Sequence, residues 1–299
     1  MRNFWLVLAT VALVACTRDP EHAGDTASSD GPAQRIVPTT QRIVPTTVAA
    51  AEYARELVGA ERFAAVPDQV GEWSTRDFRA EPWGSLPRFA RFAAEPLLAH
   101  RPDLVICNEW QASETVGVLR QAGVRVVVLP TATRWADVQA NLTLLGEQLG
   151  RETEAEACLA RWEVRLAALR ARATSGWRAI AYTNDGSGGT ASGDGTTIRT
   201  IMEMAGLQDV SGVRGHAVVD YELLIVRDPD VLVVGAPSSD ERGATEALLR
   251  SDPVLRSLRA VQLGRIAVLP TGLYSTDSPT ILEAAELLVT RIEALQGSK

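Results

Sequence analysis

The segment Glu95-Pro-Leu-Leu-Ala-His-Arg-Pro-Asp-Leu-Val-Ile106 indicates the fold, because its pattern is repeated in Glu222-Leu-Leu-Ile-Val-Arg-Asp-Pro-Asp-Val-Leu-Val-Val234. Each copy runs from a glutamate through an apolar stretch of helical character to Pro-Asp and an apolar strand. The glutamate stands seven positions before the proline in both. Alternating helical and strand patterns predict βα units and a mostly parallel sheet.

The similarity continues downstream of both copies. Arg125-Val-Val-Val-Leu-Pro-Thr131 and Arg265-Ile-Ala-Val-Leu-Pro-Thr271 are near copies, and the helical patterns 138–149 and 279–295 follow them. The chain is therefore predicted to be an α/β protein with two lobes of similar design. A cleft between two lobes is a default place for a ligand. The paired glutamates are a symmetric feature that a two-fold partner could recognise.

A long stretch without Gly or Pro separates the lobes. In this stretch Leu159, Trp162, Leu166 and Leu169 follow one another at spacings of three and four, which predicts one helix with an apolar face. We expect this helix to connect the lobes. The predicted parts are a signal peptide (1–15), a lipidated cysteine and tether (16–40), an N-lobe (41–150), the connecting helix (151–174) and a C-lobe (175–299).

The N-terminus has the pattern of an export signal. Arg2 precedes the apolar run 4–14, which is too short for an ordinary transmembrane helix. Leu13-Val14-Ala15-Cys16 resembles the bacterial lipobox, which predicts a lipid on Cys16 and an exported protein held at a membrane. The alternative is a plain signal peptide cleaved nearby.

A short tandem repeat precedes the N-lobe. Gln34-Arg-Ile-Val-Pro-Thr-Thr40 is repeated without change as residues 41–47. Only one copy can form the first strand. We expect the second to do so, because a helical stretch (49–58) follows it and ends at Gly59.

Composition excludes several classes of function. The net charge of −7 disfavours binding to nucleic acid or to an anionic membrane surface. With only three histidines, a His-rich site for a free transition metal is disfavoured. The catalytic motifs GxSxG and HExxH are missing from the sequence. We expect a binding protein without enzyme activity or a resident cofactor.

Several linked motifs resemble one family. They are Arg42-Ile-Val44, Arg101-Pro-Asp-Leu-Val-Ile106, the helix end 141–150, Asp228-Pro-Asp-Val-Leu-Val-Val234 and Leu258-Arg-Ala-Val-Gln-Leu-Gly-Arg-Ile-Ala-Val268. In this order and spacing the chain resembles the periplasmic substrate-binding proteins of ABC importers for iron-siderophores, heme and cobalamin. The turns 45–48 and 87–92, which face the cleft in that family, depart from its usual pattern.

The resemblance implies two lobes around one rigid helix, with lobes that move only slightly. It also implies an ABC permease and its ATPase as partners. In such proteins one glutamate on each lobe contacts arginines of the permease, and these positions fall on Glu95 and Glu222. Alternatively, both are acids favoured by the dipole at a helix N-terminus. We expect a monomer that delivers its ligand to the permease; a sensor or scavenger without a transport role is the alternative.

Aromatic side chains and arginines gather in the loops predicted to line the cleft. Aromatic faces suit a large flat ligand, and guanidinium groups suit the anionic groups of a ferric siderophore. The ligand-binding candidates are Trp73, Trp83, Trp110, Trp135, Tyr221, Tyr274, Arg88, Arg91, Arg134 and Arg214. The sequence thus favours an iron-siderophore or related metal-chelate.

Two other ligands remain open. Heme would need an axial ligand, for which His216, Tyr221 and Tyr274 are available. Cobalamin fits the tryptophans but gives no reason for the arginines. The glycine-rich stretch 185–195 lacks a P-loop or EF-hand spacing and is expected to be a flexible loop that leads into a helix.

Overall fold

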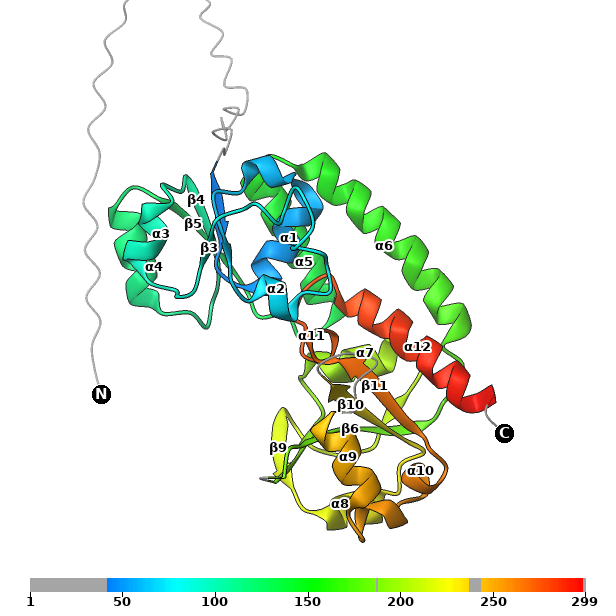
Figure 1. Cartoon of the computed structure of the whole chain (residues 1–299). Coiled ribbons are helices and arrows are strands. Elements are labelled where there is room, and N and C mark those ends of the chain that lie inside the picture. The colour runs from blue at the N-terminus through cyan, green and yellow to red at the C-terminus, as the bar shows by residue number, and fades with distance from the viewer. Residues whose placement is uncertain (1–41, 187, 237–242, 298–299) are drawn as a thin grey trace, which may run out of the picture. The chain divides into compact units, whose positions relative to one another are not determined.

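The computed structural model of the protein describes residues 42–186, 188–236 and 243–297. These residues form the two α/β lobes and the long connecting helix that the sequence predicts (Figure 1). The predicted signal peptide, Cys16 and the first copy of the tandem repeat lie outside the described residues. Among the described helices, none combines the length and apolar character that crossing a membrane requires.

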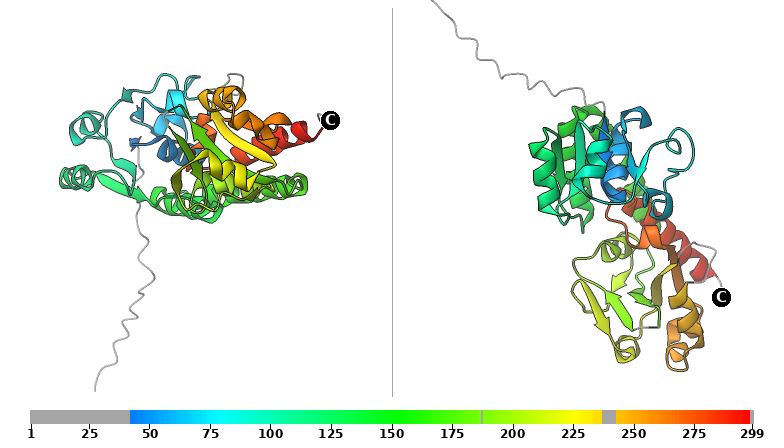
Figure 2. Two further views of the ribbon diagram at one scale, coloured as in Figure 1. Left: turned by 90° about the horizontal axis from the view of Figure 1, so that it is seen from below. Right: turned by 60° about the vertical axis from the view of Figure 1, so that its left-hand side comes forward.

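The N-lobe is built on a parallel three-stranded sheet in the order β1-β4-β5, with a two-stranded sheet of β2 and β3 beside it. Its elements are β1 (Ile43–Pro45), α1 (Val48–Leu57), a 3-10 turn (Ala60–Arg62), β2 (Val66–Pro67), α2 (Val70–Trp73), β3 (Arg88–Phe89), α3 (Ala94–Ala99), β4 (Leu104–Asn108), α4 (Ser113–Gln121), β5 (Arg125–Leu129) and α5 (Trp135–Leu149). The second copy of the tandem repeat therefore supplies the first described strand. The right view of Figure 2 shows this sheet between α3 and α4 on one face and α1 and α5 on the other.

The C-lobe repeats the arrangement, with parallel strands in the order β6-β10-β11. Two antiparallel strands, β7 and β9, extend this sheet beyond β6, and β8 also pairs with β6. The elements are β6 (Arg178–Asn184), β7 (Gly189–Ser192), α7 (Thr197–Met204), β8 (Gln208–Asp209), β9 (His216–Val219), α8 (Tyr221–Arg227), β10 (Val231–Ala236), α9 (Ala244–Ser251), a 3-10 turn (Leu255–Ser257), α10 (Arg259–Gln262), β11 (Ile266–Pro270), α11 (Thr271–Tyr274) and α12 (Ile281–Gly297).

One expectation about the C-lobe was wrong in part. The glycine-rich stretch after β6 is not all loop, because residues 189–192 form β7 and pair with β6. Gly189 makes the close approach possible: a Cβ there would lie 2.2 Å from the Tyr182 hydroxyl oxygen. The small residues that suggested flexibility instead allow a strand to lie against a tyrosine ring.

The two lobes pair their equivalent strands in the same register. In the N-lobe, Ile43 pairs with Leu104, and in the C-lobe Ala179 pairs with Val231. In both cases the residue after an arginine pairs with the second residue after the proline of Pro-Asp. The sequence repeat is thus a repeat of three-dimensional structure.

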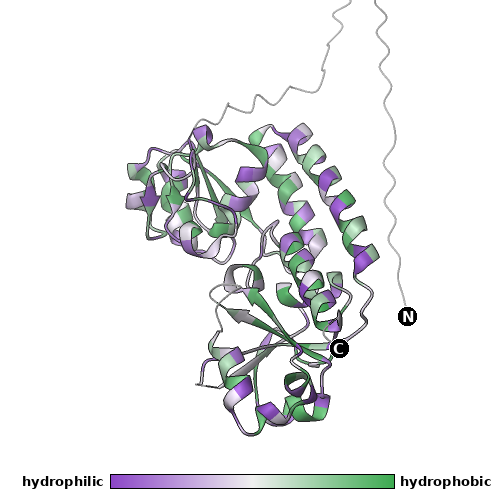
Figure 3. Ribbon diagram, turned by 45° about the vertical axis from the view of Figure 1, so that its right-hand side comes forward, coloured by the Kyte–Doolittle hydropathy of each residue, from purple (hydrophilic) through white to green (hydrophobic). Residues whose placement is uncertain are grey.

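The connecting helix α6 (Glu152–Arg172) lies beside α12, as Figures 1 and 3 both show. One continuous apolar cluster includes residues of α1 and α5, of α6, and of α7 and α12. Side chains of β6 alternate between the two faces of the C-lobe sheet. Ala179 and Ala181 belong to this shared cluster, while Ile180 and Tyr182 belong to a separate cluster under α8 and α9. The lobes therefore share one hydrophobic core.

Candidate functional site

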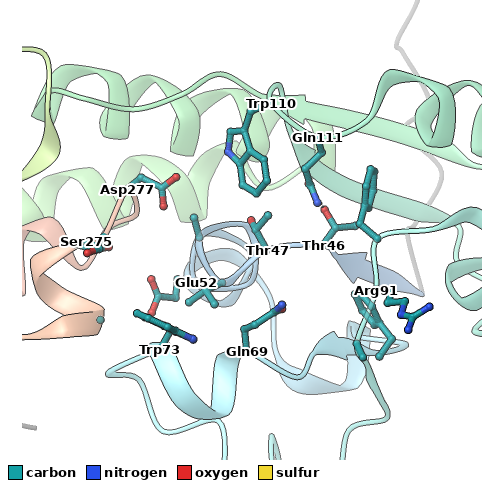
Figure 4. A pocket seen from close by; sticks show the side chains of 17 residues that line it. Thr46, Thr47, Glu52, Gln69, Trp73, Arg91, Trp110, Gln111, Ser275 and Asp277 are labelled. Atoms are coloured by element: carbon teal, nitrogen blue, oxygen red, sulfur yellow. The ribbon is translucent and has the colours of Figure 1, made fainter. Parts of the chain in front are cut away.

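A cavity of about 400 Å³ lies between the two lobes. The end of β1, the start of α1, α2 and the segments 89–92 and 110–111 supply its N-lobe wall, and residues 272–277 supply the facing wall. Figure 4 shows the cavity looking onto the start of α1. Cavities of this size in proteins commonly hold small molecules and cofactors.

Hydrogen bonds organise the N-lobe wall at the ends of its parallel strands. Thr46, just after β1, donates through Oγ1 to the Ile106 carbonyl oxygen at 3.1 Å and to Gln111 Oε1 at 2.5 Å. Thr47 Oγ1 donates to Asn108 Oδ1 at 2.6 Å and caps α1 by accepting from the Ala50 amide at 3.0 Å. Strand ends are where open α/β sheets present ligand-binding groups.

Two tryptophans present their rings to the cavity. Trp73 and Trp110 are 42% and 65% exposed, which is unusual for so large an apolar side chain. They come from α2 and from the turn after β4, and Figure 4 shows them on opposite sides of the start of α1. Exposed rings on two sides of a cavity suit a large ligand with flat or apolar faces.

Two carboxyl groups also line the cavity, and the sequence analysis did not select either. Glu52 of α1 is 2% exposed and accepts hydrogen bonds from the hydroxyls of Ser74 and Ser278. Burial raises its pKa from 4.5 to about 7, against the lowering effect of these hydroxyls and of Arg76. Burial likewise raises the pKa of Asp277 on the facing wall. The lining thus holds two carboxyl groups whose protonated forms are favoured by burial.

A weak sequence feature marks both carboxyls. Glu52 follows three alanines in the helix after Pro45-Thr46, and Asp277 follows Pro270-Thr271, so each comes shortly after a Pro-Thr strand end. Periodicity alone places Glu52 on the buried face of α1 among apolar residues. The cavity that makes this position accessible from the cleft requires the second lobe.

Three of the predicted ligand-binding residues line the cavity: Trp73, Arg91 and Trp110. The structure does not bring the other predicted residues into it. Trp83 instead packs edge-on against Phe63 and Phe78, at ring-centroid distances of 5.0 and 5.4 Å.

The remaining predicted arginines have partners within their own lobe. Arg88 donates to the Phe78 carbonyl oxygen at 2.6 Å. Arg134 pairs with Asp137 at 2.9 Å, and Arg214 lies 3.7 Å from Asp194. Arg91 is therefore the one predicted arginine that reaches the lining among the described residues.

The other predicted aromatic residues pack against the protein. Trp135 lies 5.3 Å from the Trp162 ring, where α5 meets α6. Tyr221 packs on the cluster under α8 and α9, and Tyr274 is 6% exposed, with its ring over Gly235. None of the described residues lining the cavity is a His, Tyr, Cys or Met. No group of three His, Cys, Asp or Glu side chains among the described residues could hold a metal ion.

The paired glutamates occupy equivalent places on the surface. Glu95 lies in the first turn of α3 and Glu222 in the first turn of α8, and both are exposed. The residue two positions further on, Leu97 or Leu224, is fully buried and anchors each helix. Within the described part of the chain, neither glutamate forms an ion pair.

Comparisons with known proteins agree with this architecture. Residues 57–272 match the periplasmic binding protein family. A cobalamin-binding protein of Halobacterium salinarum is 30% identical over 196 residues, which make up 63% of this chain and 53% of that protein. The chain thus spans about half the length of the curated relatives it matches.

Solved structures share the fold. The periplasmic heme-binding protein HutB of Vibrio cholerae superposes with a TM-score of 0.74 at 19% identity, over 85% of this chain and 99% of that one. The periplasmic heme-binding protein RhuT of Roseiflexus gives 0.73 at 22% identity, over 86% and 99%. The periplasmic vitamin B12 binding protein BtuF of Vibrio cholerae gives 0.65 at 19% identity, over 87% and 99%. At these identities the likeness concerns the fold alone.

Proposed function

From the premise that this chain belongs to the periplasmic binding protein family, we propose that it captures a corrinoid of the cobalamin type and delivers it to an ABC importer. Membership implies an exported protein that binds a small molecule. The ligand class and the docking residues are the finer parts of the proposal. The observation that carries the ligand class is the cavity lining, which joins two exposed tryptophans to amide and hydroxyl groups and a single arginine.

Charge separates a corrinoid from an anionic ferric siderophore. The arginines that favoured a siderophore pair elsewhere, so that among the predicted arginines Arg91 alone offers a positive charge to an anion in the described lining. The sequence argument against cobalamin was that it left the arginines unexplained, and their placement removes that objection. The Halobacterium relative named for cobalamin binding supports the same class.

The polar lining suits a ligand that carries many amides. Gln69 and Gln111 present side-chain amides and Ser275 presents a hydroxyl, whereas the hydroxyls of Thr46 and Thr47 hold Gln111 and Asn108 in place. The first turn of α1 adds backbone N–H groups of Val48 and Ala49, which lie before the first intrahelical bonds. Heme has weaker support, since the described lining offers no axial ligand from His, Tyr, Cys or Met.

A panel titration tests the ligand class. Tryptophan fluorescence of the purified protein is followed against cyanocobalamin, hemin, a neutral ferric hydroxamate and an anionic ferric catecholate. We expect saturable quenching by cyanocobalamin, weakened about tenfold by Trp73→Ala or Trp110→Ala, because each removes a ring face. Trp177→Phe, in the C-lobe away from the cavity, serves as the control. Saturation by the ferric catecholate alone would return the assignment to siderophores.

We further propose that Glu95 and Glu222 dock this protein on its permease. Both are exposed acids without an ion pair in the described structure, at matching places of two similar lobes. Replacing both with alanine should leave the affinity for cyanocobalamin unchanged and abolish uptake by cells. A permease gene and an ATPase gene beside this one are also expected. Their absence, or normal uptake by the double variant, would favour a sensor or scavenger role instead.

The lipid anchor at Cys16 remains part of the proposal. It rests on the lipobox-like sequence Leu13-Val14-Ala15-Cys16 alone. Cys16→Ser should release the protein from the membrane fraction of the producing cells. Membrane retention of that variant would contradict it.

A further inference from the structure

The two helices that carry the proposed docking glutamates are short and end in the same unusual way. In α3 and α8 the chain leaves the helix through a non-glycine residue with positive φ: Arg101 at 49° and Asp228 at 37°. Each stands directly before the proline of Pro-Asp. This conformation is disfavoured for L-residues, and a following proline also restricts the residue before it. Strained residues of this kind persist where their surroundings hold them.

One arginine in each lobe holds this turn. Arg42 donates from Nε to the Arg101 carbonyl oxygen at 2.8 Å and from Nη2 to that of His100 at 2.5 Å. In the C-lobe, Arg178 donates from Nη1 to the Asp228 carbonyl oxygen at 3.0 Å and from Nη2 to that of Arg227. The same two carbonyls, counted back from the proline, are bound in both lobes. These are groups that a helix end leaves without intrahelical partners.

The main chain of each arginine completes the attachment. The Asp103 amide donates to the Arg42 carbonyl oxygen at 2.9 Å, and the Asp230 amide donates to that of Arg178 at 2.8 Å. Arg42 stands immediately before β1, and Arg178 is the first residue of β6. The turn that ends the docking helix is thereby tied to the sheet by both backbone and side chain.

We propose that Arg42 and Arg178 are positioning residues of the docking surface: each locks the C-terminus of its glutamate-bearing helix to the central sheet of its lobe. The inference rests on the proposed docking role of Glu95 and Glu222. A rigid partner can bind both glutamates only if the distance between them is constant. A helix of six or seven residues is not stable by itself, so its orientation depends on contacts with the rest of the lobe. The arginine fixes the orientation of the helix end, because its planar guanidinium group binds two carbonyl oxygens in a fixed geometry.

The C-lobe turn has a second support. Arg259 lies 3.2 Å from Asp228 Oδ2 and 2.8 Å from Asp230 Oδ1, so a second guanidinium bridges the same turn.

A double-mutant cycle tests the inference. The full chain is titrated onto the permease–ATPase complex encoded beside its gene, held in lipid nanodiscs, and the dissociation constant of docking is measured. We expect Glu95→Ala to weaken docking about tenfold and Arg42→Gln about fivefold. In the Glu95→Ala background, Arg42→Gln should change docking by less than about twofold, because the arginine acts only through that glutamate. Cyanocobalamin quenching and the melting temperature are recorded for every variant.

Two further variants separate positioning from general stability. Arg42→Lys keeps a donor and should recover part of the docking lost in Arg42→Gln. Arg170→Gln removes an exposed arginine of α6 and should leave docking unchanged. An equal loss from Arg42→Gln with and without Glu95 would overturn the inference, as would full docking by Arg42→Gln when Glu95→Ala docks poorly. Full docking by both Glu95→Ala and Glu222→Ala would instead refute the docking role on which it rests.

Discussion

Glu52 shows how one residue links the lobes at the floor of the cleft. Its helix belongs to the N-lobe, whereas Ser278 belongs to the segment that leaves the C-lobe sheet for α12. A second hydroxyl there, on Thr280, lies 3.4 Å from the same carboxyl oxygen. Its charged neighbours are Arg76 and Glu283. A buried carboxyl with hydroxyl partners holds two chain segments that are far apart in sequence.

The raised pKa of Glu52 makes stability depend on pH. The folded chain keeps a proton on Glu52 up to about pH 7, whereas the unfolded chain releases it near 4.5. The free energy of unfolding should therefore fall as pH rises across this range, by about 3 kcal/mol. In Glu52→Gln this part of the dependence should vanish. Denaturant unfolding of both proteins between pH 4 and 8 measures the difference.

The control for that experiment is Glu147→Gln, at an exposed position of α5. It should follow the native protein at every pH. A constant difference in unfolding free energy between Glu52→Gln and the native chain would contradict the role of this carboxyl.

Between elements, α6 and α12 are joined by a ladder of ion pairs. Arg165 binds both oxygens of Glu286 at 3.0 and 2.7 Å, and Arg172 binds both oxygens of Glu293 at 3.0 and 2.6 Å. The two ion pairs are seven residues, or about two turns, apart on each helix. Because both helices advance in the same direction between the pairs, α6 and α12 run parallel. The ladder covers the outer side of the shared apolar core.

Removing the ladder should lower stability modestly. The four side chains are about one-third to one-half exposed, so solvent screens each pair. We expect Glu286→Ala with Glu293→Ala to lower the urea midpoint slightly in low salt and by less in 1 M salt. Urea unfolding measures this, with Glu156→Ala on α6 as the control. A loss of several kcal/mol, or no dependence on salt, would show that packing rather than charge joins these helices.

On the scale of the whole molecule, one of the apolar clusters runs through both lobes. The cluster that contains Ile43 of the N-lobe also contains Trp162 of α6 and Leu288 of α12. A direct bond adds to it, from Thr200 Oγ1 of α7 to the Thr133 carbonyl oxygen at 2.7 Å. Wide opening of the cleft would expose apolar surface of this cluster to water, at a free-energy cost of roughly 25 cal/mol per Å².

Ligand binding should therefore move the lobes little. We expect the radius of gyration from small-angle X-ray scattering to change by less than about 1 Å when cyanocobalamin saturates the protein. A larger decrease would mean that the shared core opens in the free protein.

Local sequence patterns were enough to predict the repeated half of each lobe and the connecting helix. Those features depend on local patterns: the Pro-Asp turn, the apolar strands and the uninterrupted helix that became α6. The exposed helix-start positions of Glu95 and Glu222 follow from the same repeat. Trp73, Trp110 and Arg91 could be predicted as cavity residues because they come from segments that follow strand ends.

The rest of the site depends on contacts between segments that are distant in sequence. Arg134 and Trp83 lie in loops that the sequence assigns to the cleft. In the structure Arg134 pairs with Asp137, and Trp83 packs against the Phe63 ring. Glu52 lies on the buried face of α1 by periodicity and reaches the cavity only because the Ser278 segment crosses from the other lobe. Long-range pairing of this kind has no local pattern, since the partners are 226 residues apart. Local preferences therefore determined the elements, and packing between distant segments determined the pocket.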